Sequence, residues 1–170
     1  ALHELSGTVW TGCDLNTTAS DMDKLIEQAP YVLAGIGSAV DTNVATATTT
    51  IGSIMGVVDS FKLDIKEQTF LVQGCGKVGS VVAKSLVSLG AREVKTYDVV
   101  EGRAAIEGCT AVVGEKWWEE SVEFLVPCGN SLAIDETVVS SMSPKFVVGA
   151  TNQPYKNEAV RRAFDEKGVL

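Results

Sequence analysis

The feature that most constrains this chain is a short apolar segment that leads directly into closely spaced glycines. Residues 70–72 are Phe, Leu and Val, a run typical of a strand buried on both faces. The turn that follows has the spacing G-x-G-x-x-G and comprises Gly74, Cys75, Gly76, Lys77, Val78 and Gly79. Apolar residues then recur at helical spacing as far as Gly90, which is well placed to end a helix.

Strand, glycine turn and helix, in this order, are what dinucleotide binding requires. In such a site Gly74 permits the tight turn, Gly76 lets the backbone approach a pyrophosphate, and Gly79 lets the helix pack closely on the strand. The N-terminus of the helix then faces the anion. We therefore predict that residues 74–79 bind a dinucleotide.

An acidic residue stands where a dinucleotide site needs one. Residues 93–97 have the pattern of a second strand, and Asp98 follows them, about 20 residues beyond the glycines. A carboxylate there accepts hydrogen bonds from the adenosine ribose hydroxyls, whereas the 2′-phosphate of NADP would meet like charge. The sequence therefore favours NAD over NADP, and the alternative is that Asp98 only caps a loop.

The rest of the chain alternates strand-like and helix-like segments. Further strands are predicted around residues 7–14, 111–113, 122–127 and 145–149, and further helices around 21–28, 43–61, 134–142 and after 157. This alternation predicts an α/β fold, a Rossmann-like, doubly wound, mostly parallel sheet with helices on both faces. Because ligands collect at the carboxyl ends of parallel strands, the loops at 74–79, 98, 127–130 and 150–152 should form the site.

Composition limits the classes of partner. The 170 residues suffice for one domain of ordinary size, or for one domain and a fragment of another. The net charge of -8 and the lack of a basic run argue against nucleic-acid binding. No apolar run approaches the roughly 20 residues that span a bilayer. We expect a soluble protein without a membrane partner, cytoplasmic by default, with an organelle left open.

The cysteines predict neither a metal site nor a disulfide framework. Cys13, Cys75, Cys109 and Cys128 lack C-x-x-C spacing, so reduced thiols are expected. Cys128 follows a proline at the end of an apolar run, as a nucleophile could. The single histidine, His3, lies near the N-terminus, however, so a catalytic Cys/His pair is not favoured.

Several of these stretches resemble the cofactor-binding, C-terminal domain of the glutamate/leucine/phenylalanine/valine dehydrogenase family. The stretches are residues 12–18 with 21–23, 45–47, 71–79, 126–128 and 149–153. The resemblance implies oxidative deamination of an L-amino acid to a 2-oxo acid and ammonia, with hydride transfer to NAD. It implies that Asp14 is the catalytic acid/base group. It also adds four cofactor-binding residues to Asp98 and the glycine turn: Thr46, Pro127, Cys128 and Asn152.

The same resemblance implies partners and a division of the chain. Residues 1–16 would be the tail of a substrate domain, and residues 17–170 an NAD-binding domain that is incomplete at its C-terminus relative to the family. The expected partners are an amino acid or 2-oxo acid, the missing substrate domain, and further copies in a homo-oligomer. We therefore predict the NAD-binding portion of an amino-acid dehydrogenase, not active alone. The alternative is a catalytically inactive, dehydrogenase-derived binding or assembly module.

Overall fold

The structure, a computed structural model, describes residues 2–14, 16–33, 37, 39 and 41–170. Leu15, within one of the stretches that carry the resemblance, lies outside the described residues. The chain forms two compact units, Ala1–Ala45 (unit 1) and Thr46–Leu170 (unit 2), and each is described by itself. The predicted division into residues 1–16 and 17–170 stays a prediction.

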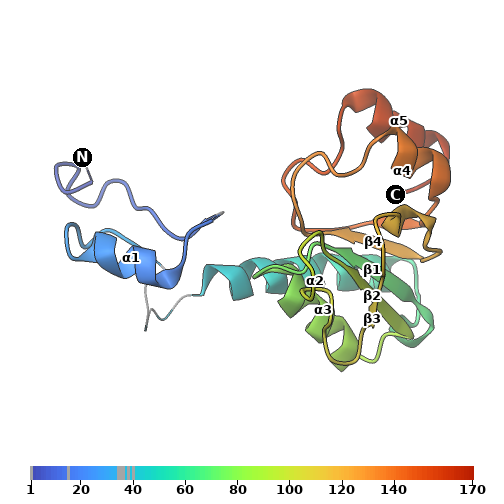
Figure 1. Cartoon of the computed structure of the whole chain (residues 1–170), viewed down its shortest axis with the longest axis horizontal. Coiled ribbons are helices and arrows are strands. Elements are labelled where there is room, and N and C mark those ends of the chain that lie inside the picture. The colour runs from blue at the N-terminus through green and yellow to red at the C-terminus, as the bar shows by residue number, and fades with distance from the viewer. Residues whose placement is uncertain (1, 15, 34–36, 38, 40) are drawn as a thin grey trace. The chain divides into compact units, whose positions relative to one another are not determined.

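Unit 2 is built on a five-stranded sheet in which every strand pair is parallel (Figure 1). Its strands are β1 Thr69–Gln73, β2 Glu93–Tyr97, β3 Thr110–Ala111, β4 Phe124–Pro127 and β5 Phe146–Val147. Their order across the sheet is β3-β2-β1-β4-β5. The chain therefore moves outward from β1 in one direction and returns to add β4 and β5 on the other side, as in doubly wound folds.

Helices cover both faces of this sheet. The helices are α2 Thr42–Ser60, α3 Gly79–Ser88, α4 Glu136–Ser141 and α5 Glu158–Glu166, with 3-10 turns at Ile65–Glu67 and Trp117–Glu119. Because strand side chains alternate, Phe70 and Val72 pack in one core with α2 and α3. Leu71 packs in a second core with α4 and α5. The predicted Rossmann-like α/β fold is confirmed.

A row of aromatic rings joins β1, β4 and β5 on the face of the sheet that packs against α2 and α3. The rings of Phe70 and Phe124 stack with centroids 4.7 Å apart, and those of Phe124 and Phe146 with centroids 4.8 Å apart. The three residues are register partners across β1, β4 and β5. Each such pair contributes about 0.5–1.5 kcal/mol beyond the burial of its area. The row therefore fixes the strand register that sets the positions of the loops at the carboxyl ends.

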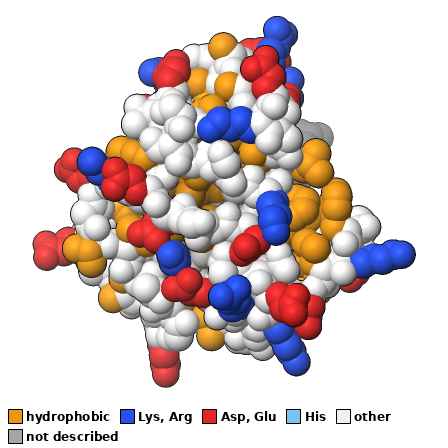
Figure 2. Space-filling view, turned by 90° about the vertical axis from the view of Figure 1, so that its right-hand side faces the viewer, with side chains coloured by type: hydrophobic (Ala, Val, Ile, Leu, Met, Phe, Trp, Pro, Cys, Tyr) orange, Lys and Arg blue, Asp and Glu red, His pale blue; other side chains and the backbone are white. Residues whose placement is uncertain are grey.

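The outer face of α5 is charged, in contrast to its buried face. Val160 and Phe164 point into the core, whereas Arg161 pairs with Glu158 at 2.8 Å and with Asp165 at 3.0 Å. Figure 2 shows acidic and basic side chains interspersed over one face of the molecule. Exposed pairs of this kind contribute little stability, so packing of the apolar side holds α5 in place.

The one helix that lies wholly within the described part of unit 1 is α1 Ala19–Ile26. Thr18 and Asp21 form a reciprocal capping box at its start. Residues 7–14 were predicted to form a short strand that leads into a polar turn; the strand is wrong, since Thr11 alone forms an isolated bridge, with Val32. Gly7 turns the chain with a φ of 85°, and pairing beyond Thr11 has no partner strand among the described residues.

Several predicted elements of unit 2 are shorter than expected, among them the strand predicted at residues 145–149, which is the two-residue β5. The strand predicted at residues 111–113 is the two-residue β3, and Val113 beyond it is 95% exposed. The helix predicted from residue 134 begins at Glu136, because the side chain of Asp135 caps it by accepting the N–H groups of Thr137 and Val138. In the described part of the chain, no helix is long and apolar enough to cross a membrane.

Candidate dinucleotide site

The glycine turn lies between β1 and α3, and Gly74 fixes its shape. The Gly74 N–H donates to the carbonyl oxygen of Tyr97 at 2.7 Å, which ties the turn to the end of β2. Gly74 has a φ of +91°, a region that favours glycine. A Cβ on Gly74 would stand 2.3 Å from the Cα of Gly129 in the loop after β4. Gly74 therefore lets the loops after β1 and β4 meet backbone to backbone.

The other two glycines of the turn have opposite surroundings. A Cβ on Gly79 would stand 1.8 Å from the carbonyl oxygen of Gly74, so no side chain fits there. A Cβ on Gly76 would meet no atom within 4 Å. Gly79 is thus needed for packing, whereas Gly76 presents bare backbone to open space, as a backbone that receives a pyrophosphate does.

The N-terminus of α3 completes an anion-binding arrangement. The residue that precedes α3, Val78, has helical backbone angles and provides no side-chain cap. By contrast, α1, α4 and α5 are capped by Thr18, Asp135 and Asn157. The first N–H groups of α3, those of residues 79–81, therefore donate to no capping side chain. Of these, only those of Ser80 and Val81 donate to main-chain carbonyl oxygens of the described residues, those of Gly76 and Val78, so the helix start suits a bound anion. Lys77, in the same turn, is exposed.

Asp98 is aimed at the glycine turn. One of its carboxylate oxygens accepts the N–H of Cys75 at 2.7 Å, and the other accepts the N–H of Val100 at 2.8 Å. Each carboxylate oxygen can accept a further bond, so Asp98 can brace the turn and still bind hydroxyl groups. The structure therefore brings Asp98 beside residues 74–79, where the spacing predicted it.

Exposed apolar side chains flank Asp98. Val99 is 74% exposed, and Val113, which follows β3, is 95% exposed. Thr96 in β2 pairs with Ala111 in β3, so the segments that contain the two valines leave neighbouring strands at the same level. This edge of the sheet thus offers an apolar surface next to a carboxylate.

The loops after β4 and β5 join the loop after β1. The Cys128 N–H donates to the carbonyl oxygen of Gln73 at 2.7 Å. The Thr151 N–H donates to the carbonyl oxygen of Pro127 at 3.1 Å, and its hydroxyl donates to that of Gly129 at 3.0 Å. Pro127 and Cys128 therefore lie between the glycine turn and the loop with the exposed Asn152.

The cysteines of the site are suited to packing rather than to nucleophilic chemistry. Burial raises the pKa of the Cys75 thiol to about 12 and that of the Cys128 thiol to about 11. The negative charge of Asp98 also raises the pKa of Cys75. Thiolates are therefore scarce at neutral pH. None of the four cysteines is in a disulfide, and the described residues include no group of three side chains that could hold a metal ion.

The two remaining predicted residues, Asp14 and Thr46, belong to other elements of the chain. Asp14 belongs to unit 1, where Thr17 closes a turn with its backbone: the Asp14 N–H donates to the Thr17 hydroxyl at 2.8 Å. Thr46 is exposed on α2, and its carbonyl oxygen accepts the hydroxyl of Thr50 at 2.9 Å. The catalytic role of Asp14 and the cofactor contact of Thr46 stay predictions.

Sequence reasoning missed two residues that shape the site. Gly149 has no room for a side chain, since its Cβ would stand 2.2 Å from the carbonyl oxygen of Pro127. Gln73 closes β1 with a buried polar side chain that the apolar strand pattern did not single out. The position of Gly149, directly after a predicted strand, could have indicated its role. No local sequence pattern indicates the role of Gln73.

The sheet order, the glycine turn and Asp98 define a Rossmann-like domain of the type found in dehydrogenases. No protein-family model matches the chain. The phenylalanine dehydrogenase of Bacillus thermotolerans is 25% identical over an alignment of 189 positions, which covers 99% of this chain and 48% of that protein. The chain is thus homologous to about half of an amino-acid dehydrogenase, and its resemblance to the C-terminal part of that family is confirmed.

Solved structures agree on the fold. The L-tryptophan dehydrogenase of Nostoc punctiforme has a TM-score of 0.75 and 22% identity, covering 99% of this chain and 50% of that one. The hetero-hexameric glutamate dehydrogenase of Thermus thermophilus has a TM-score of 0.74 and 19% identity, covering 95% and 45%. The chain spans about half the length of each relative.

The glycines predict a sharp contrast between two substitutions. Gly79→Ala should lower the free energy of unfolding by at least about 3 kcal/mol, because its Cβ would overlap the Gly74 carbonyl oxygen. Gly76→Ala should change it by no more than about 0.5 kcal/mol, because its Cβ meets open space. Urea unfolding followed by circular dichroism measures both, and equal losses would contradict the geometry.

Proposed function

We propose that this chain is the NAD-binding portion of an L-amino-acid dehydrogenase. The observation that carries the proposal is the bond from the Cys75 N–H to Asp98, which sets a carboxylate beside an uncapped helix N-terminus. A dinucleotide needs both groups, since its pyrophosphate is an anion and its ribose hydroxyls are donors. Homology to amino-acid dehydrogenases along the chain supports the same function.

The residues present fit such a cofactor. The N–H groups at Gly76 and the start of α3 would hold the pyrophosphate, and the open space at Gly76 would admit it. Asp98 would hold the adenosine ribose, and the exposed side chains of Val99 and Val113 would contact the adenine. Pro127, Cys128 and Asn152 would border the nicotinamide end.

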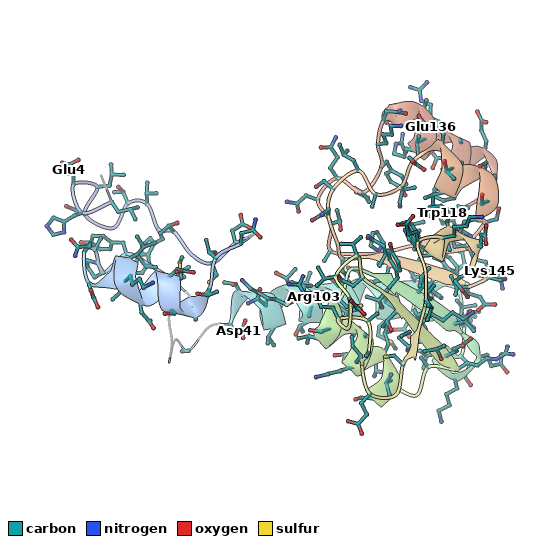
Figure 3. The ribbon with its side chains drawn as sticks, viewed as in Figure 1. Glu4, Asp41, Arg103, Trp118, Glu136 and Lys145 are labelled. Carbon is teal, nitrogen blue, oxygen red and sulfur yellow. The ribbon has the colours of Figure 1, made fainter. Side chains whose placement is uncertain are left out.

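The charge of Asp98 favours NAD over NADP, because a 2′-phosphate beside it would meet like charge. Arg103 lies on the loop after Asp98 (Figure 3) and is the nearest cation along the chain on that side. An arginine near this position can accommodate a 2′-phosphate. NADP should therefore be titrated as a second ligand, and the Arg103→Ala variant shows whether this arginine contributes to NADP affinity.

The proposed reaction divides its tasks between cofactor and protein. When bound, NAD would supply the acceptor for a hydride from the α-carbon of the amino acid, while the amine loses a proton; water would then hydrolyse the imine to a 2-oxo acid and ammonia. Asp14 would move protons during hydrolysis, since a loop carboxylate can act as acid and base. Thr46 and Asn152 would orient the nicotinamide or the substrate.

Unit 1 supports a partner domain for this chain. Its buried apolar side chains among the described residues are Met22, Ala29 and Val32. Other apolar side chains of unit 1 remain two-fifths to one-half exposed, including Val9, Trp10, Leu25 and Ile26. Because so few buried side chains give unit 1 little stability, we propose that it packs against a substrate domain. We also propose a homo-oligomer; the hetero-hexameric glutamate dehydrogenase of Thermus thermophilus supports assembly of such subunits, though not from identical copies.

Calorimetric titration tests the cofactor. Wild type should bind NAD more tightly than NADP. Asp98→Ala should weaken NAD binding at least tenfold, because the ribose loses its acceptor and Cys75 its brace. Asp135→Ala is the matched control: this aspartate also accepts two main-chain N–H groups, but at α4, so NAD binding should not change. No heat of binding at millimolar NAD would refute the proposal.

Turnover tests the reaction. Joined to the substrate half of the Bacillus thermotolerans relative, the chain should form NADH when an L-amino acid is supplied. Asp14→Asn should lower kcat by about a hundredfold or more without changing NAD affinity, since only proton transfer is lost. A joined protein that binds NAD yet turns over no amino acid would instead support the alternative, a dehydrogenase-derived binding or assembly module.

A further inference from the structure

We propose that Gln73 is a positioning residue for the cofactor: its buried amide oxygen accepts a main-chain N–H of the loop after β4 once NAD is bound. That loop, residues 128–131, is called the β4 loop below. The inference rests on the proposed NAD binding and concerns how the site is held in its bound form.

Gln73 carries an unmatched polar atom in the interior of unit 2. The residue is 6% exposed, and its side-chain oxygen Oε1 has no hydrogen-bond partner in the described part of the chain. A buried acceptor without a donor is costly, and native proteins contain few of them. A hydrogen bond that forms only in the cofactor-bound protein would explain why a glutamine occupies this buried position.

The residue stands at the point where ligands bind doubly wound sheets. Gln73 ends β1 and is the register partner of Tyr97 in β2 and of Pro127 in β4. Between β1 and β4 the chain reverses the direction in which it adds strands. Ligands of doubly wound sheets usually bind outside the carboxyl ends of these two strands, and Gln73 is the last residue of β1 at that end.

The Gln73 amide lies directly against the β4 loop. A Cβ on Gly129 would stand 2.8 Å from Nε2 of Gln73 and 3.0 Å from its Oε1. The main chain of Gln73 already accepts the Cys128 N–H at 2.7 Å. The next two N–H groups, of Gly129 and Asn130, donate to no main-chain carbonyl oxygen of the described residues. A side-chain acceptor without a donor therefore lies against Gly129, in a loop whose N–H groups lack main-chain acceptors.

Cofactor binding would bring these groups together. Gly129 is partly exposed and Asn130 is exposed, so water can serve their N–H groups in the free protein. A dinucleotide over this end of the sheet would displace that water, and the N–H groups would then need a protein acceptor. Oε1 of Gln73 lies against Gly129 in the same loop and is unused. One new bond would fix the β4 loop beneath the cofactor.

Gln73→Met tests the inference, because methionine keeps the size of the side chain and removes the amide. NAD should bind about tenfold more weakly, as expected for one lost buried hydrogen bond. The Tm without NAD should not fall, since the variant also removes an unmatched buried oxygen. A purely space-filling glutamine would leave both the Tm and the NAD affinity unchanged, because methionine fills the same space; an unchanged NAD affinity would therefore overturn the inference.

Gln68→Met is the matched control. Gln68 is 7% exposed and also has an unpartnered side-chain oxygen, but it precedes β1 at the opposite end of the strand. Its variant should bind NAD as wild type does, with some loss of Tm because its Nε2 donates to the carbonyl oxygen of Asp64. Equal effects of the two variants on NAD affinity would overturn the role of Gln73.

A measurement on the wild type covers the case in which Gln73→Met does not fold. In the NAD complex, nuclear magnetic resonance should detect a coupling across the hydrogen bond from the Gly129 or Asn130 nitrogen to the Gln73 side-chain carbonyl carbon. The free protein should lack it. No coupling in a saturated complex would overturn this inference alone, whereas no NAD binding by the wild type would overturn the proposed function as well.

Discussion

The close approach of three glycine backbones is the constraint on which the site depends. Gly74 meets Gly129 on one side and Gly79 on the other, at distances that leave no room for a Cβ on Gly74 or Gly79. The loop after β1, the start of α3 and the loop after β4 are therefore packed as bare main chain. Because the main chain itself is packed at these points, its N–H groups are held in fixed directions.

The sheet places those backbones, and one carboxylate completes the site. The Phe70, Phe124 and Phe146 rings hold β1, β4 and β5 in register, so their carboxyl ends lie at one edge. The adjacent strand β2 delivers Asp98 to the same edge, where it accepts the Cys75 N–H. The side chain that would bind a ribose thus also braces the turn that would bind the pyrophosphate.

Much of this arrangement could be predicted from the sequence, because short-range patterns carry it. The spacing of Gly74, Gly76 and Gly79 after an apolar run predicted the turn and α3, and the distance to Asp98 predicted a second contact. Strand and helix alternation predicted the parallel sheet. Local periodicity identifies buried strands well, so β1, β2 and β4 were predicted within a few residues.

The rest depends on contacts between segments distant in sequence. A strand over residues 7–14 failed because only Thr11 finds a pairing partner, and β3 is short because pairing with β2 ends at Ala111. The unmatched oxygen of Gln73 follows from its neighbours in the fold and not from its own pattern. The placement of Asp14 with respect to the nicotinamide likewise depends on tertiary structure and stays a prediction.

A crystal structure of the chain grown with NAD tests the central claim most directly. The account predicts electron density for the pyrophosphate against the main-chain N–H groups from Gly76 to Gly79, and for the adenosine ribose hydroxyls on Asp98. A dinucleotide bound elsewhere on the chain, or a site that stays empty at saturating NAD, would contradict it.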